Sequence, residues 1–493
     1  MVMQNAQKLK VLFITSEIYP LCKTGGLGDV SASLPVALQN LQTDIKILLP
    51  GYPSVMQGVK YKRKVAEFKD LQHFPPTTLL AGKLALSKTE SLSVLVIDCP
   101  GLYAREGGPY LDASGHDWPD NALRFGLLSK IGAILSSDAS PLKWQPDIAH
   151  CNDWQSGLTP AYLHFHSGAK APTVITIHNL AFQGNFAAGT VIQLGLPASS
   201  FNVHGVEYYG NLSFLKAGIY YADHITTVSS NYAKEIQKEP LGFGMQGLLT
   251  TRSKQLTGII NGIDIEKWNP ETDPYLAKNY SSKKLSNKSF NKAALQQRMG
   301  LDVDDAIPLF GVISRLTYQK GTDLLIQIIP DLVKLPAQLV ILGSTHVELE
   351  AQLMSLAKEY PQSIAVTICF DEALSHLIEA GSDCFLMPSR FEPCGLNQMY
   401  SQRYGTPPIV HATGGLVDTV VNLTPDTLAN GTASGFSFSP ITIGNLFSTI
   451  QLVVEIYGNT KTWQKLQKNA MAKDFSWQAS AAAYQEIYRS LIE

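Results

Sequence analysis

The sequence has no closely spaced cysteine pair, no long apolar run and no excess of charge of one sign. Its six cysteines are scattered without CxxC spacing, which argues against a disulfide framework and against a zinc site. Apolar stretches such as DLLIQIIPDLV are too short to span a bilayer, and the start, MVMQNAQKLK, lacks the apolar core of a signal peptide. These absences favour a cytoplasmic protein with reduced thiols and no membrane segment.

The near-neutral charge indicates which class of macromolecule the protein is not expected to bind. With 39 Lys and Arg against 41 Asp and Glu, the formal net charge is −2, and the basic residues form no long run. A groove for a polyanion needs clustered positive charge, so nucleic acid is not expected as a partner. A neutral polymer such as a polysaccharide needs no such field, although near-neutrality alone cannot point to one.

What the chain does have is 493 residues in which apolar strands alternate with helical patterns, too long for one ordinary domain. Continuous apolar strands between helices predict a parallel sheet that is covered on both faces. Two series of such strands predict two doubly wound α/β domains, over residues 1–258 and 259–474. An amphipathic helix over 475–493 is expected to return to the first domain.

The expected strands predict where the functional residues should lie. Ligands of open α/β sheets bind beyond the carboxyl ends of the strands, so the informative residues should follow them. The first series is 10–16, 44–50, 93–98, 147–150, 173–178 and 224–229, and the second is 308–314, 338–343, 364–370, 383–389 and 407–413.

A glycine-rich turn, CKTGGLGDV, follows the first expected strand. Gly25, Gly26 and Gly28 remove side chains where the loop enters a helix, so backbone N–H groups can approach an anion, and Lys23 adds a positive charge beside them. A plain strand-to-helix turn is the alternative. The lysine next to three glycines favours a functional turn.

Polar groups also end two neighbouring strands of the first series. Asp153 lies in HCNDWQSGL, and His178 and Asn179 lie in TIHNLAFQGNF. Both His178 and Asn179 can hydrogen-bond a polyol. Asp153 could equally cap the helix that follows it.

The second series carries cations and free amides at its strand ends. Arg315 and Lys320, in ISRLTYQKG, flank a turn and could both reach a diphosphate, although two surface cations near a helix start are common. In SRFEPCGLN, Glu392 is placed to accept hydrogen bonds from sugar hydroxyls. The helix start around Gly395 and Leu396 offers a second anion cradle.

No metal ion and no cofactor is expected. Asp302-Val-Asp304 has the form of a metal-binding DxD motif, but it lies in a polar stretch before a strand, where solvated surface is the favoured interpretation. His164 and His166 lie two apart on an expected helix, hence on different faces, and are poor co-ligands.

The motifs together resemble those of one family. SEIYPLCKTGGLGDV, YLDASGHDWPDNALRF, HCNDWQSGL, TIHNLAFQGNF, INGID, ISRLTYQKG, SRFEPCGLNQMYSQRYG and TGGLVDTV occur in this order. Over nearly its whole length the chain is similar to bacterial glycogen synthases and plant starch synthases. The resemblance implies a GT-B fold, in which two Rossmann-like doubly wound parallel-sheet domains face each other across a deep cleft.

The resemblance also implies an activity and its residues. The enzyme would transfer glucose from ADP-glucose to the non-reducing end of an α-1,4-glucan, either glycogen or a maltooligosaccharide, with retention of configuration. Cations would neutralise the diphosphate, and the remaining catalytic groups would line the glucose site. The implied catalytic residues are Arg315, Lys320, Glu392, His178 and Asp153, and the implied substrate-binding residues are Lys23, Gly25, Gly26, Asp29, Tyr110, Asn179, Phe370, Cys394, Gly395 and Leu396.

The chain departs from the family pattern in four places. Phe370 stands where Tyr is usual near the nucleobase, Gln246 where an acidic residue is usual, LGSTHVE (342–348) where an LGSGD-like turn is usual, and Ser230 where Pro is usual. None of these touches the expected phosphate-binding residues. The departures leave open a catalytically altered paralogue that binds glucan or primes its synthesis.

A glucan phosphorylase or hydrolase is a further alternative. A phosphorylase would require pyridoxal phosphate, and a hydrolase would need two carboxylates flanking the bond. Strand-end cations and glycine turns suit a phosphate leaving group better.

Overall fold

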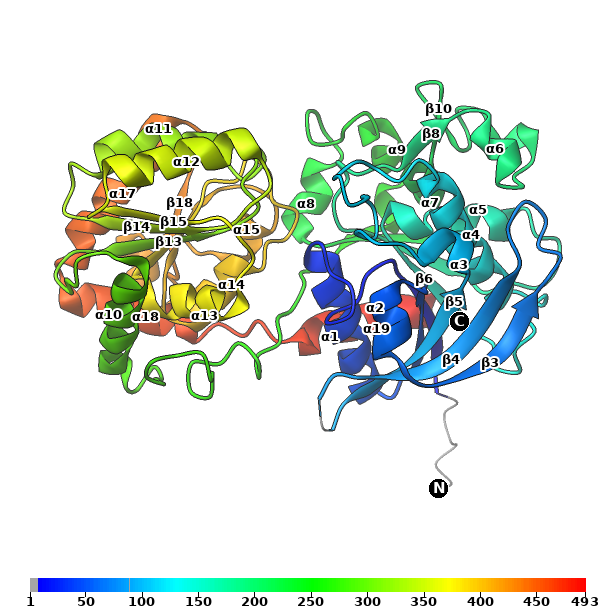
Figure 1. The fold of residues 1–493 in the computed structure, drawn as a ribbon, viewed down its shortest axis with the longest axis horizontal. Helices are drawn as coiled ribbons and strands as arrows, with labels where there is room; N and C mark the ends of the chain where they lie inside the picture. The colour runs from blue at the N-terminus through cyan, green and yellow to red at the C-terminus, as the bar shows by residue number, and fades with distance from the viewer. Residues whose placement is uncertain (1–7, 88) are drawn as a thin grey trace. The chain divides into compact units, whose positions relative to one another are not determined.

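The computed structural model describes residues 8–87 and 89–493, which form two compact α/β units (Figure 1). Unit 1 consists of Met1–Gly262 together with Trp477–Glu493, and unit 2 of Ile263–Ser476. The expectation about a signal peptide rests largely on residues 1–7, which lie outside the described residues. The expected division after residue 258 falls at the end of a strand, and residues 259–262 stay with unit 1.

Unit 1 is built on a nine-stranded sheet whose parallel part reverses its strand order once. In spatial order the strands are β12 (Leu256–Gly258), β11 (His224–Thr227), β7 (Thr173–Ile177), β6 (Ile148–Asn152), β1 (Lys10–Ile14), β2 (Asp44–Pro50), β5 (Ser91–Asp98), β4 (Thr77–Ala85) and β3 (Lys60–Phe68). All pairs from β12 to β5 are parallel. The order reverses between β1 and β6, which is the place where Rossmann-type sheets bind ligands.

The sequence predicted only parallel strands, whereas the sheet also contains an antiparallel hairpin formed by β3 and β4. β4 pairs antiparallel with both β3 and β5. β3, KYKRKVAEF, is an edge strand with mostly exposed side chains, so Lys and Arg replace the apolar run that marks a buried strand. A small separate sheet, also not expected, has strands too short to leave a pattern: β8 (Asn185–Ala187), β10 (Asn211–Ser213) and β9 (Glu207–Tyr208).

Helices cover both faces of the unit 1 sheet. Successive residues of β6 point to opposite faces: His150 meets Tyr488 of α19 (Trp477–Ser490), whereas Cys151 meets Thr159 of α5 (Leu158–His164). The C-terminal helix packs beside α1 (Gly26–Asn40) (Figure 1). The other helices are α2 (Pro53–Gly58), α3 (Pro100–Tyr103), α4 (Asn121–Leu135), α6 (Thr190–Gln193), α7 (Phe214–Tyr221), α8 (Ser230–Glu235) and α9 (Gln246–Thr251).

Unit 2 contains a six-stranded sheet in which every pair is parallel. In spatial order the strands are β15 (Ile364–Thr367), β14 (Gln338–Leu342), β13 (Leu309–Ile313), β16 (Cys384–Met387), β17 (Pro408–His411) and β18 (Phe436–Phe438). Numbered within the unit, this order is 3-2-1-4-5-6, that of the Rossmann fold, with its reversal between β13 and β16. Only β18 has no counterpart among the expected strands.

The unit 2 sheet is buried on both faces. Along β14, Leu339 and Ile341 belong to one apolar cluster and Val340 and Leu342 to another. The two faces are covered by helices (Figure 1). The helices of this unit are α10 (Lys288–Met299), α11 (Thr322–Leu332), α12 (Val347–Glu359), α13 (Glu372–Gly381), α14 (Asn397–Arg403), α15 (Gly414–Thr419), α16 (Pro425–Ala429), α17 (Ile443–Tyr457) and α18 (Thr460–Met471). Of the helices described in either unit, none is long and apolar enough to cross a membrane.

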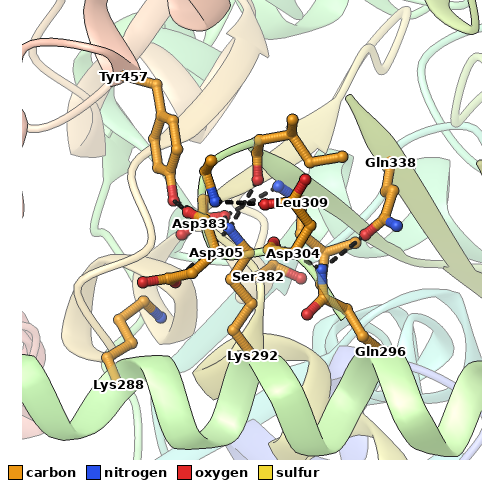
Figure 2. A network of polar contacts seen from close by, with 12 residues as sticks. Lys288, Lys292, Gln296, Asp304, Asp305, Leu309, Gln338, Ser382, Asp383 and Tyr457 are labelled. Atoms are coloured by element: carbon orange, nitrogen blue, oxygen red, sulfur yellow. Dashed lines mark hydrogen bonds and ion pairs between the residues drawn. The ribbon is translucent and has the colours of Figure 1, made fainter. Parts of the chain in front are cut away.

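A buried polar network fixes α10 to the sheet of unit 2 (Figure 2). Lys292, only 1% exposed, places its Nζ 2.9 Å from Asp383 Oδ2 and 2.9 Å from the Tyr457 hydroxyl. One helical turn further on, Gln296 Nε2 donates to Gln338 Oε1 at 2.7 Å. Because Lys292 is paired with Asp383, this face of α10 can be buried without leaving an isolated charge, although Gln296 Oε1 has no hydrogen-bond partner among the described residues.

Candidate active site

In each unit, the turns after the two strands at the reversal carry several of the candidate residues. In unit 1, the turn after β1 leads to Lys23, and the turn after β6 begins with Asp153. In unit 2, Lys320 follows β13 and Glu392 follows β16. Both pairs of strands are hydrogen-bonded neighbours, so residues distant in sequence emerge at one sheet edge.

Asp153 ties the ends of β6 and β7 together. Its Oδ1 accepts hydrogen bonds from the backbone N–H groups of His178, at 2.7 Å, and Asn179, at 3.4 Å. The side chain makes no capping bond to the short helix that follows, so the capping interpretation is not realised. Its backbone, at φ 54° and ψ −170°, lies in a region that is almost restricted to glycine and that is often found at functional sites.

Burial shifts the pKa values of Asp153 and His178 far from their ordinary values. Burial raises the pKa of the Asp153 carboxyl to about 7; the backbone hydrogen bonds oppose the shift, and the charge of Glu17 adds to it. Burial lowers the pKa of the His178 imidazole to about 3, so this ring is neutral at physiological pH. His178 Nε2 lies 3.0 Å from Asn152 Oδ1, which fixes the orientation of the ring. The arrangement offers a neutral imidazole beside a carboxyl group that titrates near neutrality.

The glycine-rich turn is held from inside by Glu17. Gly25 is the extended residue before α1, which begins at Gly26, and a Cβ atom at Gly25 would meet no other atom. The N–H of Thr24 donates to Glu17 Oε2 at 2.6 Å. Lys23 is exposed, and its Nζ lies 2.7 Å from Asp29 Oδ2. Lys23 of the turn and Asp29 in the first turn of α1 thus form an ion pair.

Tyr110 joins this turn from a distant segment. Its hydroxyl donates to Glu17 Oε1 at 2.5 Å and lies 2.8 Å from Ser16 Oγ. Its ring lies 6.3 Å from that of Trp154, which directly follows Asp153. Tyr110 therefore connects the glycine turn with the Asp153 strand end.

In unit 2, Lys320 and Glu392 form a close ion pair. Their Nζ and Oε2 atoms are 2.5 Å apart, and Ser389 Oγ donates to the same carboxylate oxygen at 3.1 Å. Glu392 is 6% exposed, whereas Arg315 is exposed at the end of β13. One cation is thus oriented by a buried carboxylate, and the second extends into solvent.

The turn that carries Glu392 lies directly on a glycine pair. The N–H of Gly415 donates to Glu392 O at 3.1 Å, and a Cβ at Gly415 would lie 2.3 Å from Cys394 O. Only glycine allows this approach, which explains the glycines of TGGL structurally. Across the described residues, the N–H groups of Gly395 and Leu396 donate to no acceptor, so they remain available at the start of α14.

Not every expected residue joins these clusters. Phe370 is 80% exposed, and no contact joins it to the Lys320–Glu392 pair in the described residues. Cys394 is buried beneath the turn, as packing would require. Within the described ranges, no group of three or more His, Cys, Asp or Glu side chains could hold a metal ion.

Glu17 and Ser389, which orient the glycine-rich turn and Glu392, were not among the residues expected from the sequence. The signal for Glu17 was available, because it follows the first strand just as Asp153 follows the fourth expected one. Ser389 left no signal, since its role depends on the local path of the backbone.

Comparison with known proteins agrees with this arrangement. Residues 10–251 match the family model for the starch synthase catalytic domain, and residues 296–471 match that for glycosyl transferases group 1. A glycogen synthase of Nitrosomonas eutropha is 64% identical over 487 residues, covering 99% of this chain and 97% of that protein. One of Nitrosospira multiformis is 60% identical, covering 99% and 98%. The chain belongs to the glycogen synthase family.

Membership of this family makes the protein a hexosyltransferase, and the expected GT-B class is confirmed. Among solved structures, the catalytic domain of starch synthase IV from Arabidopsis thaliana, bound to ADP and acarbose, matches with a TM-score of 0.86 and 31% identity, covering 98% of this chain and 99% of that one. A sucrose-phosphate synthase from Thermosynechococcus elongatus, at 16% identity and a TM-score of 0.60, shares the fold.

Proposed function

We propose that this enzyme transfers glucose from ADP-glucose to the non-reducing end of an α-1,4-glucan, with retention of configuration. The observation that carries the proposal is the Lys320–Glu392 pair beside the free amides of Gly395 and Leu396. The starch synthase that shares the fold was solved with ADP and acarbose, which supports an adenine donor and a glucan acceptor.

The proposed reaction breaks the bond between the anomeric carbon and the diphosphate oxygen, and ADP leaves with an additional negative charge. Lys320 and Arg315 supply positive charge to it, and the amides of Gly395 and Leu396 donate hydrogen bonds. Fixed cations and amides stabilise developing charge without reorganisation. Glu392 positions Lys320 and accepts hydrogen bonds from the sugar hydroxyls.

On the acceptor side, a glucan hydroxyl attacks the anomeric carbon from the face that ADP leaves. Its proton passes to the departing phosphate oxygen, so the charges balance without a carboxylate nucleophile. Asp153 and the neutral His178 are suited to hold the glucose hydroxyls, because one can accept hydrogen bonds and the other can either donate or accept. Lys23 lies in the turn after β1, and the Tyr110 hydroxyl contacts Glu17 of the same turn.

Labelled glucose incorporation into glycogen, from ADP-glucose and UDP-glucose in parallel, tests the proposal. Incorporation from ADP-glucose into chains that an α-1,4-specific amylase digests is the expected result. Preference for UDP-glucose would overturn the donor assignment, and a trapped glucosyl–enzyme adduct would overturn same-face attack. Glucan binding without incorporation would instead favour the altered paralogue that Phe370 and Gln246 leave open.

The proposal includes a cytoplasmic location. All six cysteines are free thiols, which suits a reducing compartment.

A further inference from the structure

A single buried carboxylate, Glu17, connects two separate parts of unit 1. It lies three residues beyond the end of β1 and is 3% exposed. One oxygen, Oε1, accepts hydrogen bonds from the Thr24 hydroxyl at 2.7 Å and from the Tyr110 hydroxyl at 2.5 Å. The other, Oε2, accepts from the N–H of Thr24 at 2.6 Å and from that of Gly25 at 3.4 Å.

The backbone of Glu17 is itself fixed. The Thr15 hydroxyl donates to Glu17 O at 3.0 Å and lies 2.9 Å from Ser31 Oγ of α1. Glu17 is therefore attached to the strand and to the helix that bracket the glycine turn. A carboxylate held this firmly can set the positions of the groups that donate to it.

The charge of Glu17 is the informative feature. Throughout the described residues, no Lys, Arg or His lies within ion-pair distance of its carboxylate, although burying an unpaired charge is costly. The donors to it among the residues that the structure describes are neutral, and they belong to the Thr24–Gly25 turn or to Tyr110. An arrangement that gives up stability in this way is typical of a functional site.

We infer that Glu17 is a positioning residue, which fixes the Lys23-to-Gly26 turn and the Tyr110 ring in one mutual arrangement for glucosyl transfer. The inference rests on the proposed function for its kinetic consequence, but not for its geometry. Glu17 acts through the turn and through Tyr110, and its carboxylate is occupied by four donors rather than free for substrate.

The kinetic test uses Glu17→Gln, which keeps the size of the side chain but removes its charge and one acceptor oxygen. A misplacement of about 1 Å costs on the order of 10²-fold, so we expect kcat to fall about 10- to 100-fold. Both kcat and kcat/KM should fall together, because the lost interactions act in the transition state. Glu67→Gln, at an exposed carboxylate of β3, is the matched control and should behave as wild type.

A double-mutant cycle with Tyr110→Phe separates positioning from general loss of stability. If Glu17 acts through Tyr110, the double variant is little worse than Glu17→Gln alone. Additive losses, or a wild-type kcat in Glu17→Gln, would overturn the inference. Should Glu17→Gln not fold, Thr24→Val and Tyr110→Phe each remove one donor, and wild-type kcat in both would be equally decisive against it.

Amide hydrogen exchange provides a readout that does not depend on activity. Glu17→Gln should accelerate exchange at Thr24, whose N–H bonds to the carboxylate, while β2 remains protected. If the wild-type enzyme transfers no glucose but exchange at Thr24 still depends on Glu17, the proposed function fails and the positioning geometry stands. Unchanged exchange at Thr24 would refute the positioning role.

Discussion

Lys320 Nζ and Glu392 Oε2 lie 2.5 Å apart, although 72 residues separate them in sequence. They meet because β13 and β16 are neighbours at the point where the strand order reverses. The buried carboxylate orients the cation. Because one partner is buried, removing the other also affects stability, so charge and hydrogen bonding must be tested separately.

Lys320→Gln separates these contributions. The amide can still donate to Glu392, but the positive charge is lost. We expect turnover to fall roughly 10²-fold or more, because the departing diphosphate loses a fixed cation. The melting temperature should also fall, because the buried Glu392 carboxylate keeps a donor but loses its counter-charge. Labelled glucose incorporation and thermal unfolding provide the two measurements.

The matched control is Lys334→Gln, at an exposed lysine that pairs with Asp331 on the surface of unit 2. Exposed pairs contribute little, so activity and stability should both stay near wild type. Equal turnover in Lys320→Gln and wild type would remove Lys320 from the mechanism.

Gly415→Ala tests whether the glycine pair positions Glu392. The new Cβ would lie 2.3 Å from Cys394 O and 2.5 Å from Cys394 Cα, and neither backbone atom can rotate away. The Glu392 turn must therefore move, and a shift of about 1 Å predicts about a 10²-fold loss of kcat. Steady-state kinetics check this expectation.

Gly444→Ala is the control for that substitution. A Cβ at Gly444, in the first turn of α17, meets no atom within 4 Å, so activity should be unchanged and stability equal or slightly higher. Wild-type kinetics in Gly415→Ala would show that the glycine pair does not set the position of Glu392.

The sequence predicted the parallel strands and the residues at their ends because both leave strong local patterns. Continuous apolar runs marked β13 and β16, and the turns after them contained Lys320 and Glu392. Their roles in the reaction remain predictions. The exposed edge strand β3 was missed because edge strands carry charge where buried strands carry apolar side chains.

Partners distant in sequence were beyond prediction. That Glu17 accepts from Tyr110, or that Asp153 bonds the backbone of His178 instead of capping a helix, depends on how separate segments meet in space. Local patterns identified Asp153 as a candidate but could not choose between its two interpretations.

Asp153→Asn should lower activity and raise the free energy of unfolding, and the gain in stability should depend on pH. Folding raises the pKa of the Asp153 carboxyl from 3.8 to about 7. Its contribution to the free energy of unfolding is therefore fully present below pH 3.8, where the carboxyl is protonated, and is lost as the pH rises to 7. The asparagine keeps an acceptor for His178 N–H without a buried charge. Relative to wild type, the variant should gain stability from pH 4 to 7, reaching on the order of 4 kcal/mol.

Denaturant unfolding at pH 4, 6 and 8 measures this gain, and glucose incorporation should be strongly reduced at each pH. Asp70→Asn, at an exposed aspartate between β3 and β4, should show no such trend. A stability difference that does not change with pH would contradict the raised pKa of Asp153.

Tyr488→Phe tests how the C-terminal helix is attached to unit 1. Burial raises the pKa of the Tyr488 phenol and lowers that of His150 to about 3, so a neutral phenol meets a neutral imidazole, with its oxygen 2.6 Å from Nδ1. On the other side of the ring, Nε2 lies 2.7 Å from the Thr176 hydroxyl. Removing the Tyr488 hydroxyl leaves His150 Nδ1 buried and unpaired, which should cost about 1–3 kcal/mol of unfolding free energy.

Denaturant unfolding measures this loss of stability, and amide hydrogen exchange in α19 and β6 shows where it acts. Tyr61→Phe, at a residue that is 88% exposed, is the control. We expect exchange to accelerate in α19 and at the end of β6, next to Asp153, because the helix and the strand share this hydrogen bond. If α19 loses protection while β6 does not, the helix is a local attachment, and the Tyr488 hydroxyl does not support the strand that carries Asp153.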